Sequence, residues 1–188
     1  MEVLTERNPS WINWITPDKF NDYDLFRIII FFVFHSPCTN LSSMRKSLSE
    51  YGWTSPWRSP YYLNRQLKQA ATNYKLVYSA STYDNMDNAL EKADLKENFP
   101  SNIANERVCI YDNQKNQFMS IFYHIRNSFA HCRLNMVDVD GECIFIFEDV
   151  QPNKNKNKLK ISARMILRKR TLLKWIDLIE HGERRYNK

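Results

Sequence analysis

The stretch FYHIRNSFAHCR, residues 122–133, decides how this chain is interpreted, because it joins an apolar helical pattern to a heavy polar load. It holds two histidines, two arginines and one asparagine within twelve residues. Buried helices seldom carry that many polar groups. The polar residues therefore form a solvated face, a satisfied structural network or a functional site.

A rotation of 100° per residue separates the helix into two faces. Four apolar side chains share one face and are expected to pack in the core: Phe118, Phe122, Ile125 and Phe129. Asn127, His131 and His124 lie on the opposite face, with Arg126 on the flank. We therefore expect the polar face to point away from the core, towards solvent or a partner.

The composition favours one helical domain over residues 1–188. The chain is 43% hydrophobic, which suits a sizeable core, and three glycines argue against glycine-rich phosphate loops. The long apolar run at 25–34 contains Arg27 and is too short for a membrane span. Four cysteines without a CxxC pair indicate reduced thiols and no metal site, so we expect a cytoplasmic protein.

The order of the expected elements predicts an all-α fold, a helical bundle with a small β-hairpin inserted before the C-terminal helix. Alternation in GECIFIFEDV (141–150) and KLKISARMIL (158–167) predicts the hairpin, at about 141–167. Helical patterns and their caps predict helices at about 18–35, 41–51, 61–80, 82–93, 112–133 and 171–181.

Positive charge gathers at the C-terminal end of the sequence. Residues 151–188 hold twelve Lys and Arg against three Asp and Glu, whereas the remainder of the chain is slightly acidic. Such a segment suits a polyanion such as RNA, and the equally weighted alternative is a solvated lysine-rich loop. The expected RNA-binding residues are Arg133, Lys154, Lys156, Lys158 and Lys160.

The motif helix holds the parts needed for RNA cleavage. Asn127 and His131 are four residues apart, so the amide can orient the imidazole. Arg126 can bring a planar cation that matches a phosphate into the same area. An imidazole and a guanidinium can support attack of a ribose 2′-hydroxyl on its own phosphate, and this scheme requires no metal or cofactor.

The string Arg126-Asn127-Ser-Phe-Ala-His131 resembles the R-N-x-x-x-H form of the motif of the HEPN superfamily. The hairpin and the helix TLLKWI that follow it are similar to the C-terminal part of HEPN-type nucleases. The resemblance implies a metal-independent endoribonuclease, often a toxin or antiviral effector, acting on single-stranded or tRNA-like RNA. It also implies a homodimer whose active cleft forms where two motif helices meet, with an antitoxin or other regulatory partner possible.

Carried onto this sequence, the resemblance makes His131 the general acid and base, Arg126 the phosphate-stabilising group and Asn127 the residue that orients them. Some HEPN toxins carry a modifiable tyrosine two residues after the histidine, where this chain has Arg133. Two alternatives stay open. One is a non-catalytic module that binds RNA or protein through the basic 154–174 region, and the other is a structural bundle with an aromatic contact surface near Trp53 and Trp57.

Overall fold

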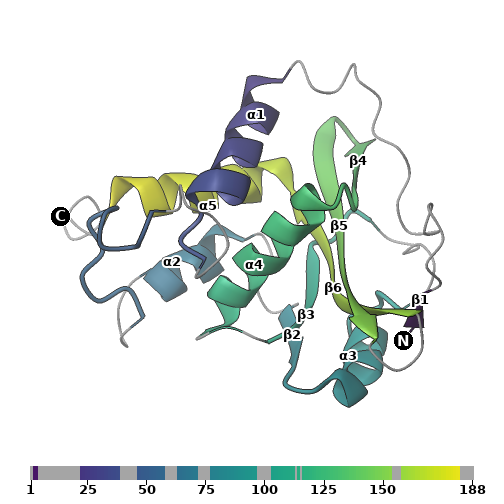
Figure 1. The fold of residues 1–188 in the computed structure, drawn as a ribbon. Helices are drawn as coiled ribbons and strands as arrows, with labels where there is room; N and C mark the ends of the chain where they lie inside the picture. The colour runs from purple at the N-terminus through teal and green to yellow at the C-terminus, as the bar shows by residue number, and fades with distance from the viewer. Residues whose placement is uncertain are drawn as a thin grey trace.

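A mixed β-sheet, not a helical bundle, forms the centre of the described chain (Figure 1). The computed structural model describes residues 2–3, 22–38, 46–57, 63–71, 77–96, 103–112, 114, 116–153 and 158–182. Within these residues the sheet has six strands: β1 (Glu2–Val3), β2 (Val77–Ala80), β3 (Arg107–Tyr111), β4 (Leu134–Val139), β5 (Glu142–Asn153) and β6 (Lys158–Arg168).

The strands follow the order β2-β3-β6-β5-β4, and β1 pairs with the start of β6. β2 and β3 are parallel, whereas every other pairing is antiparallel. The predicted hairpin is confirmed as β5 and β6, which are the two longest strands and lie in the middle of the sheet. The prediction of an all-α bundle is wrong, because this hairpin is extended by strands on both sides.

Two of the missed strands show why the all-α prediction failed. β3 has the sequence RVCIY and is buried along most of its length, and periodicity cannot distinguish so short an apolar run from a helical turn. Of the helix expected at 61–80, residues Leu63–Ala70 form α2, whereas residues Val77–Ala80 form the strand β2. Parallel pairing of β2 with β3 fixes that strand through a contact about thirty residues away in the chain.

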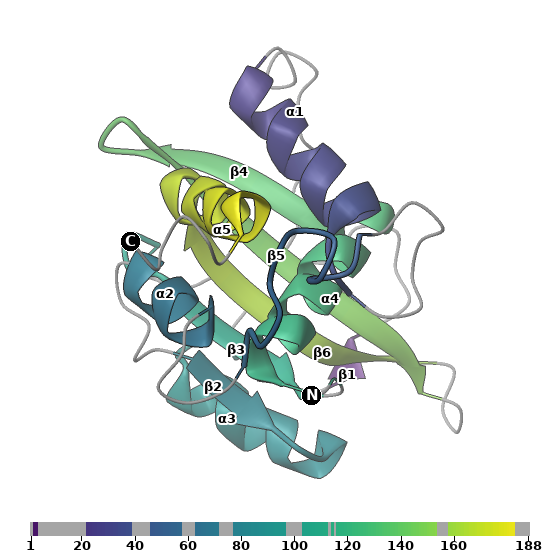
Figure 2. The ribbon, with the colours of Figure 1, turned by 90° about the vertical axis from the view of Figure 1, so that its left-hand side faces the viewer.

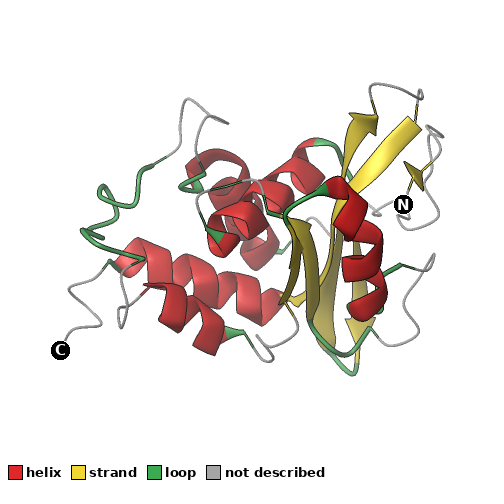
Figure 3. Ribbon diagram, turned by 90° about the horizontal axis from the view of Figure 1, so that it is seen from below, coloured by secondary structure: helices red, strands yellow, loops and turns green. Residues whose placement is uncertain are grey.

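Helices cover both faces of the sheet (Figures 2 and 3). The remaining helical segments are α1 (Tyr23–Ile30), the π-helical turn η2 (Phe31–His35), the 3₁₀ turn η4 (Tyr83–Asn85), α3 (Met86–Lys92), α4 (Gln117–Ala130) and α5 (Lys169–His181). α1, α2, α4 and α5 share one core with the sheet, while α3 packs on the opposite face. The predicted helices near 82–93 and 171–181 are confirmed. The helix expected at 41–51 is wrong for its described part, because residues 46–51 hold a turn and no helix.

Successive side chains of β5 point to opposite faces of the sheet and so contribute to two separate cores. Phe145 and Phe147 face the large helical core, whereas Ile144 and Ile146 face α3. A strand that is buried on both faces reads as an almost continuous apolar run, as IFIF does here. The same alternation directs Asp149 towards α4, because it lies two residues beyond Phe147.

The motif helix α4 begins and ends with side-chain and backbone caps. Oδ1 of Asn116 accepts a hydrogen bond from the Met119 amide at 3.0 Å, so Asn116, not Asp112, is the N-cap. At the other end Arg133 N donates to Ser128 O at 2.8 Å, and Cys132 N donates to Phe129 O at 3.1 Å. These bonds form a Schellman motif, in which Cys132 takes the left-handed position with φ of 52°.

Trp53 does not form the aromatic contact surface expected from the sequence. It is 2% exposed, and its indole Nε1 donates to the carbonyl oxygen of Ile179 at 3.0 Å. That prediction is wrong for Trp53, whose ring belongs to the core of the helical face.

Within the described residues, no helix is long and apolar enough to cross a membrane.

Candidate active site on the motif helix

The arginine and the histidine of the motif lie at the C-terminal end of α4. Arg126 is half-buried, and His131 is exposed at the C-cap of the helix. The backbone amide of His131 donates to the carbonyl oxygen of Asn127 at 2.9 Å, which fixes the cap. A guanidinium and an imidazole on one helix end are thus both within reach of a molecule in solvent.

The polar back face of α4 is not solvated, contrary to the expectation from the helical wheel. His124 has no exposed surface and Asn127 is 8% exposed, because strands β3 and β5 lie against this side of the helix. The amphipathic pattern correctly placed Phe118, Phe122 and Ile125 in the core. It could not show that the opposite face packs on the sheet.

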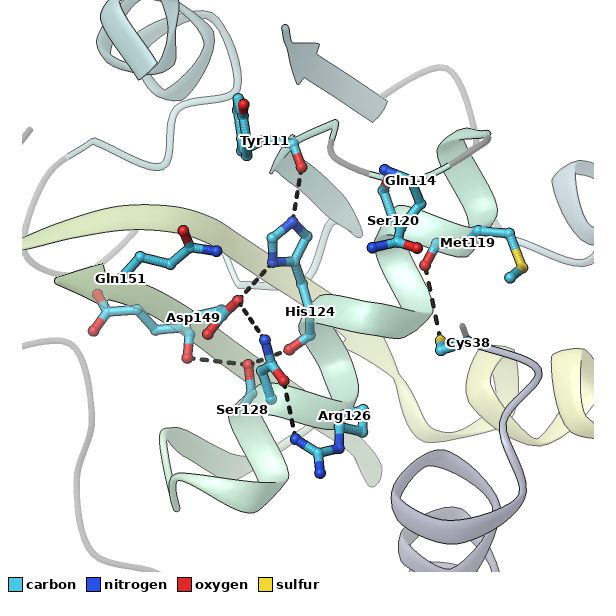
Figure 4. A network of polar contacts seen from close by, with 12 residues as sticks. Cys38, Tyr111, Gln114, Met119, Ser120, His124, Arg126, Ser128, Asp149 and Gln151 are labelled. Carbon is cyan, nitrogen blue, oxygen red and sulfur yellow. Dashed lines mark hydrogen bonds and ion pairs between the residues drawn. The ribbon is translucent and has the colours of Figure 1, made fainter. Parts of the chain in front are cut away.

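A chain of polar contacts links these buried residues to Arg126 (Figure 4). His124 Nε2 lies 2.8 Å from the carbonyl oxygen of Tyr111, and His124 Nδ1 lies 2.6 Å from Oδ2 of Asp149. Asn127 Nδ2 donates to that same Oδ2 at 3.2 Å. Arg126 Nη1 in turn donates to Oδ1 of Asn127 at 3.2 Å. The network therefore runs from the sheet to the motif arginine.

The described contacts of the Asn127 carboxamide are with Arg126 and Asp149, and not with the imidazole of His131. The structure thus brings Arg126 and Asn127 together as the sequence suggested. It links His131 to Asn127 through the backbone alone. Among the residues that the structure describes, none forms a hydrogen bond with the His131 ring.

Asp149 reaches α4 from an irregular part of the sheet. The register between β5 and β6 shifts at this point, with Asp149 opposite Ala163 and Val150 opposite Ile161. Such bulges often redirect a side chain beside a functional site. Asp149 is 1% exposed, and a buried carboxylate needs hydrogen-bond donors. His124 and Asn127 supply them.

A second buried charge network lies on the other face of the sheet. Arg133 and Arg164 both pair with the carboxylate of Glu148, which has no exposed surface. Arg164 also donates to the carbonyl oxygens of Leu95 and Lys96. Burial lowers the pKa of Arg164, and the neighbouring Glu148 opposes that shift. The network anchors the turn after the motif helix to β5 and β6.

The predicted RNA-binding residues that the structure describes are engaged in contacts within the protein. Arg133 has 13% of its side chain exposed and is paired with Glu148, so its cation is largely satisfied inside the protein. Lys160 lies over the ring of Tyr83, 5.5 Å from its centroid. Lys154 and Lys156, together with the side chain of Lys158, lie outside the described part of the chain.

Asp149 and Tyr111 are the members of the network that the sequence reading missed. Tyr111 contributes only its backbone carbonyl, which leaves no side-chain signal. Asp149 does leave one: two acidic residues follow the apolar run IFIF, and an otherwise unexplained histidine sits in an apolar helix. Acidic residues in a buried strand and a histidine in a buried helix suggest a pair, although spacing alone cannot show that they meet.

A family comparison agrees with the motif. The model of the HEPN pEK499 p136 family matches residues 59–183, which include α4, the hairpin and α5. The chain belongs to this HEPN family. No curated protein and no solved structure matches it.

Membership of the HEPN family gives the site a general class. A HEPN-type domain indicates a nuclease or a nucleotide-binding module, and such domains are often ribonucleases. The match begins before α2 and so extends well beyond the motif helix. The recognition therefore covers the sheet and helices that carry the polar network as well as the short motif string.

Proposed function

We propose that this HEPN protein is an endoribonuclease that cleaves single-stranded or tRNA-like RNA through Arg126 and His131. The supporting observation is that the half-buried Arg126 and the exposed His131 lie on one helix end, with Arg126 held by a network rooted in the sheet. A fixed cation and an accessible imidazole suit a phosphodiester, whose transition state gains negative charge at its oxygens.

In this reaction the ribose 2′-oxygen attacks the adjacent phosphorus, and the bond from phosphorus to the 5′-oxygen breaks. An imidazole of His131 removes the 2′-hydroxyl proton, and a protonated imidazole returns a proton to the leaving 5′-oxygen. Arg126 stabilises the charge on the phosphoryl oxygens. The products are a 2′,3′-cyclic phosphate and a 5′-hydroxyl, and the chemistry uses no metal or cofactor.

We also infer that a second copy of the chain completes the cleft. Five residues on a helix correspond to about 140° of rotation, so Arg126 and His131 leave α4 in different directions. Two motif helices that meet across a two-fold axis would bring an Arg126 of one chain near a His131 of the other. Mixing inactive Arg126→Ala and His131→Ala chains should then restore part of the activity, because a mixed dimer keeps one residue of each kind.

The biological role that fits such an enzyme is a toxin or an antiviral defence effector, held in check by a regulatory partner or antitoxin. Expression of the wild type beside His131→Ala tests this role. Growth arrest together with RNA fragmentation is expected for the wild type alone. Arrest of equal strength with His131→Ala would show that the motif chemistry does not cause the toxicity.

The main alternative is a non-catalytic module that binds RNA through the basic 154–174 region. The described cations of this region weaken that alternative, because three of them already have carboxylate partners. Arg168 and Arg170 both pair with Glu142, and Lys169 pairs with Asp22. Binding that persists in His131→Ala, falls with salt and yields no product would favour the module over the enzyme.

A further inference from the structure

We infer that Asp149 and His124 form a buried positioning pair that sets the direction of Asn127 and, through it, of Arg126. This inference rests on the proposed ribonuclease function and deepens it. Neither residue lies in the motif, and neither can touch a substrate while it is buried at 1% and 0% exposure. Their contribution is to hold the groups that do.

The partners of Asn127 fix the orientation of its carboxamide. An ionised carboxylate only accepts hydrogen bonds and a guanidinium only donates them. The Nδ2 group must therefore face Asp149, which leaves Oδ1 to receive Arg126, and the distances agree at 3.2 Å on each side. The amide connects an anion to a cation in one defined direction. An aspartate at position 127 would place a second carboxylate beside Asp149.

The environment of His124 explains how Asp149 can be buried there. One ring nitrogen faces the Tyr111 carbonyl, which only accepts, and the other faces the Asp149 carboxylate. The Tyr111 carbonyl makes Nε2 a donor, and Nδ1 shares a hydrogen with the Asp149 carboxyl group, so both groups are satisfied within the protein. Because both ring nitrogens are occupied, His124 is not available as a general base for RNA.

The pair also fixes how α4 sits on the sheet. His124 is bonded to β3 through Tyr111 and to β5 through Asp149. One turn further along, the hydroxyl of Ser128 lies 3.0 Å from the Glu148 carbonyl oxygen on β5. Three contacts along one side of the helix resist rotation about its axis. Rotation by a few tens of degrees would displace Arg126, because its side chain extends from the flank.

Asp149→Asn tests the positioning role, because it keeps the shape and removes the charge. We expect kcat for RNA cleavage to fall at least tenfold with KM nearly unchanged, as for an interaction made in the transition state. The matched control is Glu106→Gln, which neutralises a buried carboxylate that accepts from the Arg168 amide at 2.9 Å, beside the end of β3 opposite to Tyr111. In folded protein, Glu106→Gln should keep kcat within about twofold of wild type.

An exchange of the two groups separates positioning from general stability. Asn127→Asp alone should lower kcat, since two carboxylates then face each other. In the double variant Asn127→Asp with Asp149→Asn, an amide and a carboxylate face each other again, and part of kcat should return. Single effects that simply add in the double variant would overturn the inference. So would an Asp149→Asn enzyme with wild-type kcat.

A measurement on the resting protein separates this inference from the proposed function. The Nδ2 hydrogens of Asn127 should exchange slowly with solvent in an NMR experiment, and faster in Asp149→Asn but not in Glu106→Gln. Fast exchange in the wild type would overturn the positioning role even if RNA is cleaved. Wild-type protein that cleaves no RNA but keeps the slow exchange would overturn the ribonuclease function and leave the positioning geometry supported.

Discussion

The imidazole of His124 and the carboxylate of Asp149 meet at 2.6 Å, with both side chains removed from solvent. Removing one partner leaves the other buried and uncompensated. We therefore expect Asp149→Ala to lower the free energy of unfolding by about 3–5 kcal/mol. Urea unfolding followed by circular dichroism measures this change. A loss below about 1 kcal/mol, the usual range of an exposed pair, would contradict the described burial.

The left-handed backbone at Cys132 gives a stabilising substitution beside the motif. Its φ of 52° is unfavourable for a residue with a Cβ atom, and the Schellman hydrogen bonds require it. Cys132→Gly should raise the free energy of unfolding by about 1 kcal/mol. Thermal unfolding measures the gain, and Cys132→Ala, which keeps the Cβ, is the control that should show none.

The ion pair between Asp22 and Lys169 gives a pH-dependent prediction. The hydrogen bond from Lys169 lowers the pKa of Asp22 below its ordinary value of 3.8. The pair therefore contributes stability above pH 3.8, and this contribution is lost as the pH falls through the lowered value. Both side chains are partly exposed, so the contribution is at most about 1 kcal/mol.

Asp22→Asn isolates that charge, because asparagine also caps a helix and Asp22 is the N-cap of α1. The variant should be less stable than the wild type near neutral pH, and the difference should vanish well below pH 3.8. A stability difference that stays constant across this range would show that the charge of Asp22 contributes nothing.

Thiol chemistry should distinguish a buried cysteine, Cys109, from an exposed one, Cys132. Burial raises the pKa of Cys109 to about 12, so its thiol should resist alkylation in the folded protein. Cys132 is exposed and follows His131 directly, and we expect it to react readily. Mass spectrometry of alkylated native protein measures both sites. Modification of Cys109 before Cys132 would contradict the described burial.

The parts of the fold that the sequence predicted are those with strong local patterns. Alternation identified the hairpin, and the 3.6-residue period identified α4 and α5. β4, with the sequence LNMVDV, was missed because apolar residues stand on both of its faces, so it lacks the strict alternation of a half-buried strand. β2 and β3 depend on pairing with distant segments, which short windows cannot show.

Only the part of the candidate site that lies in one short stretch of sequence was predicted. Arg126, Asn127 and His131 stand in one short string, so their spacing could be compared with a family motif. Asp149 is 25 residues away from His124 in the chain and meets it only because β5 packs on α4. The helical wheel showed which residues share a face but not whether solvent or the sheet covers it.

Cleavage of RNA by purified protein in excess chelator tests the central claim most directly, with wild type, His131→Ala and Arg126→Ala measured side by side. We expect the wild type to produce fragments ending in 2′,3′-cyclic phosphate, and each variant to lose at least a hundredfold in rate while it stays folded. Full cleavage by His131→Ala would contradict the account. So would wild-type cleavage that is lost when chelator is added and present without it.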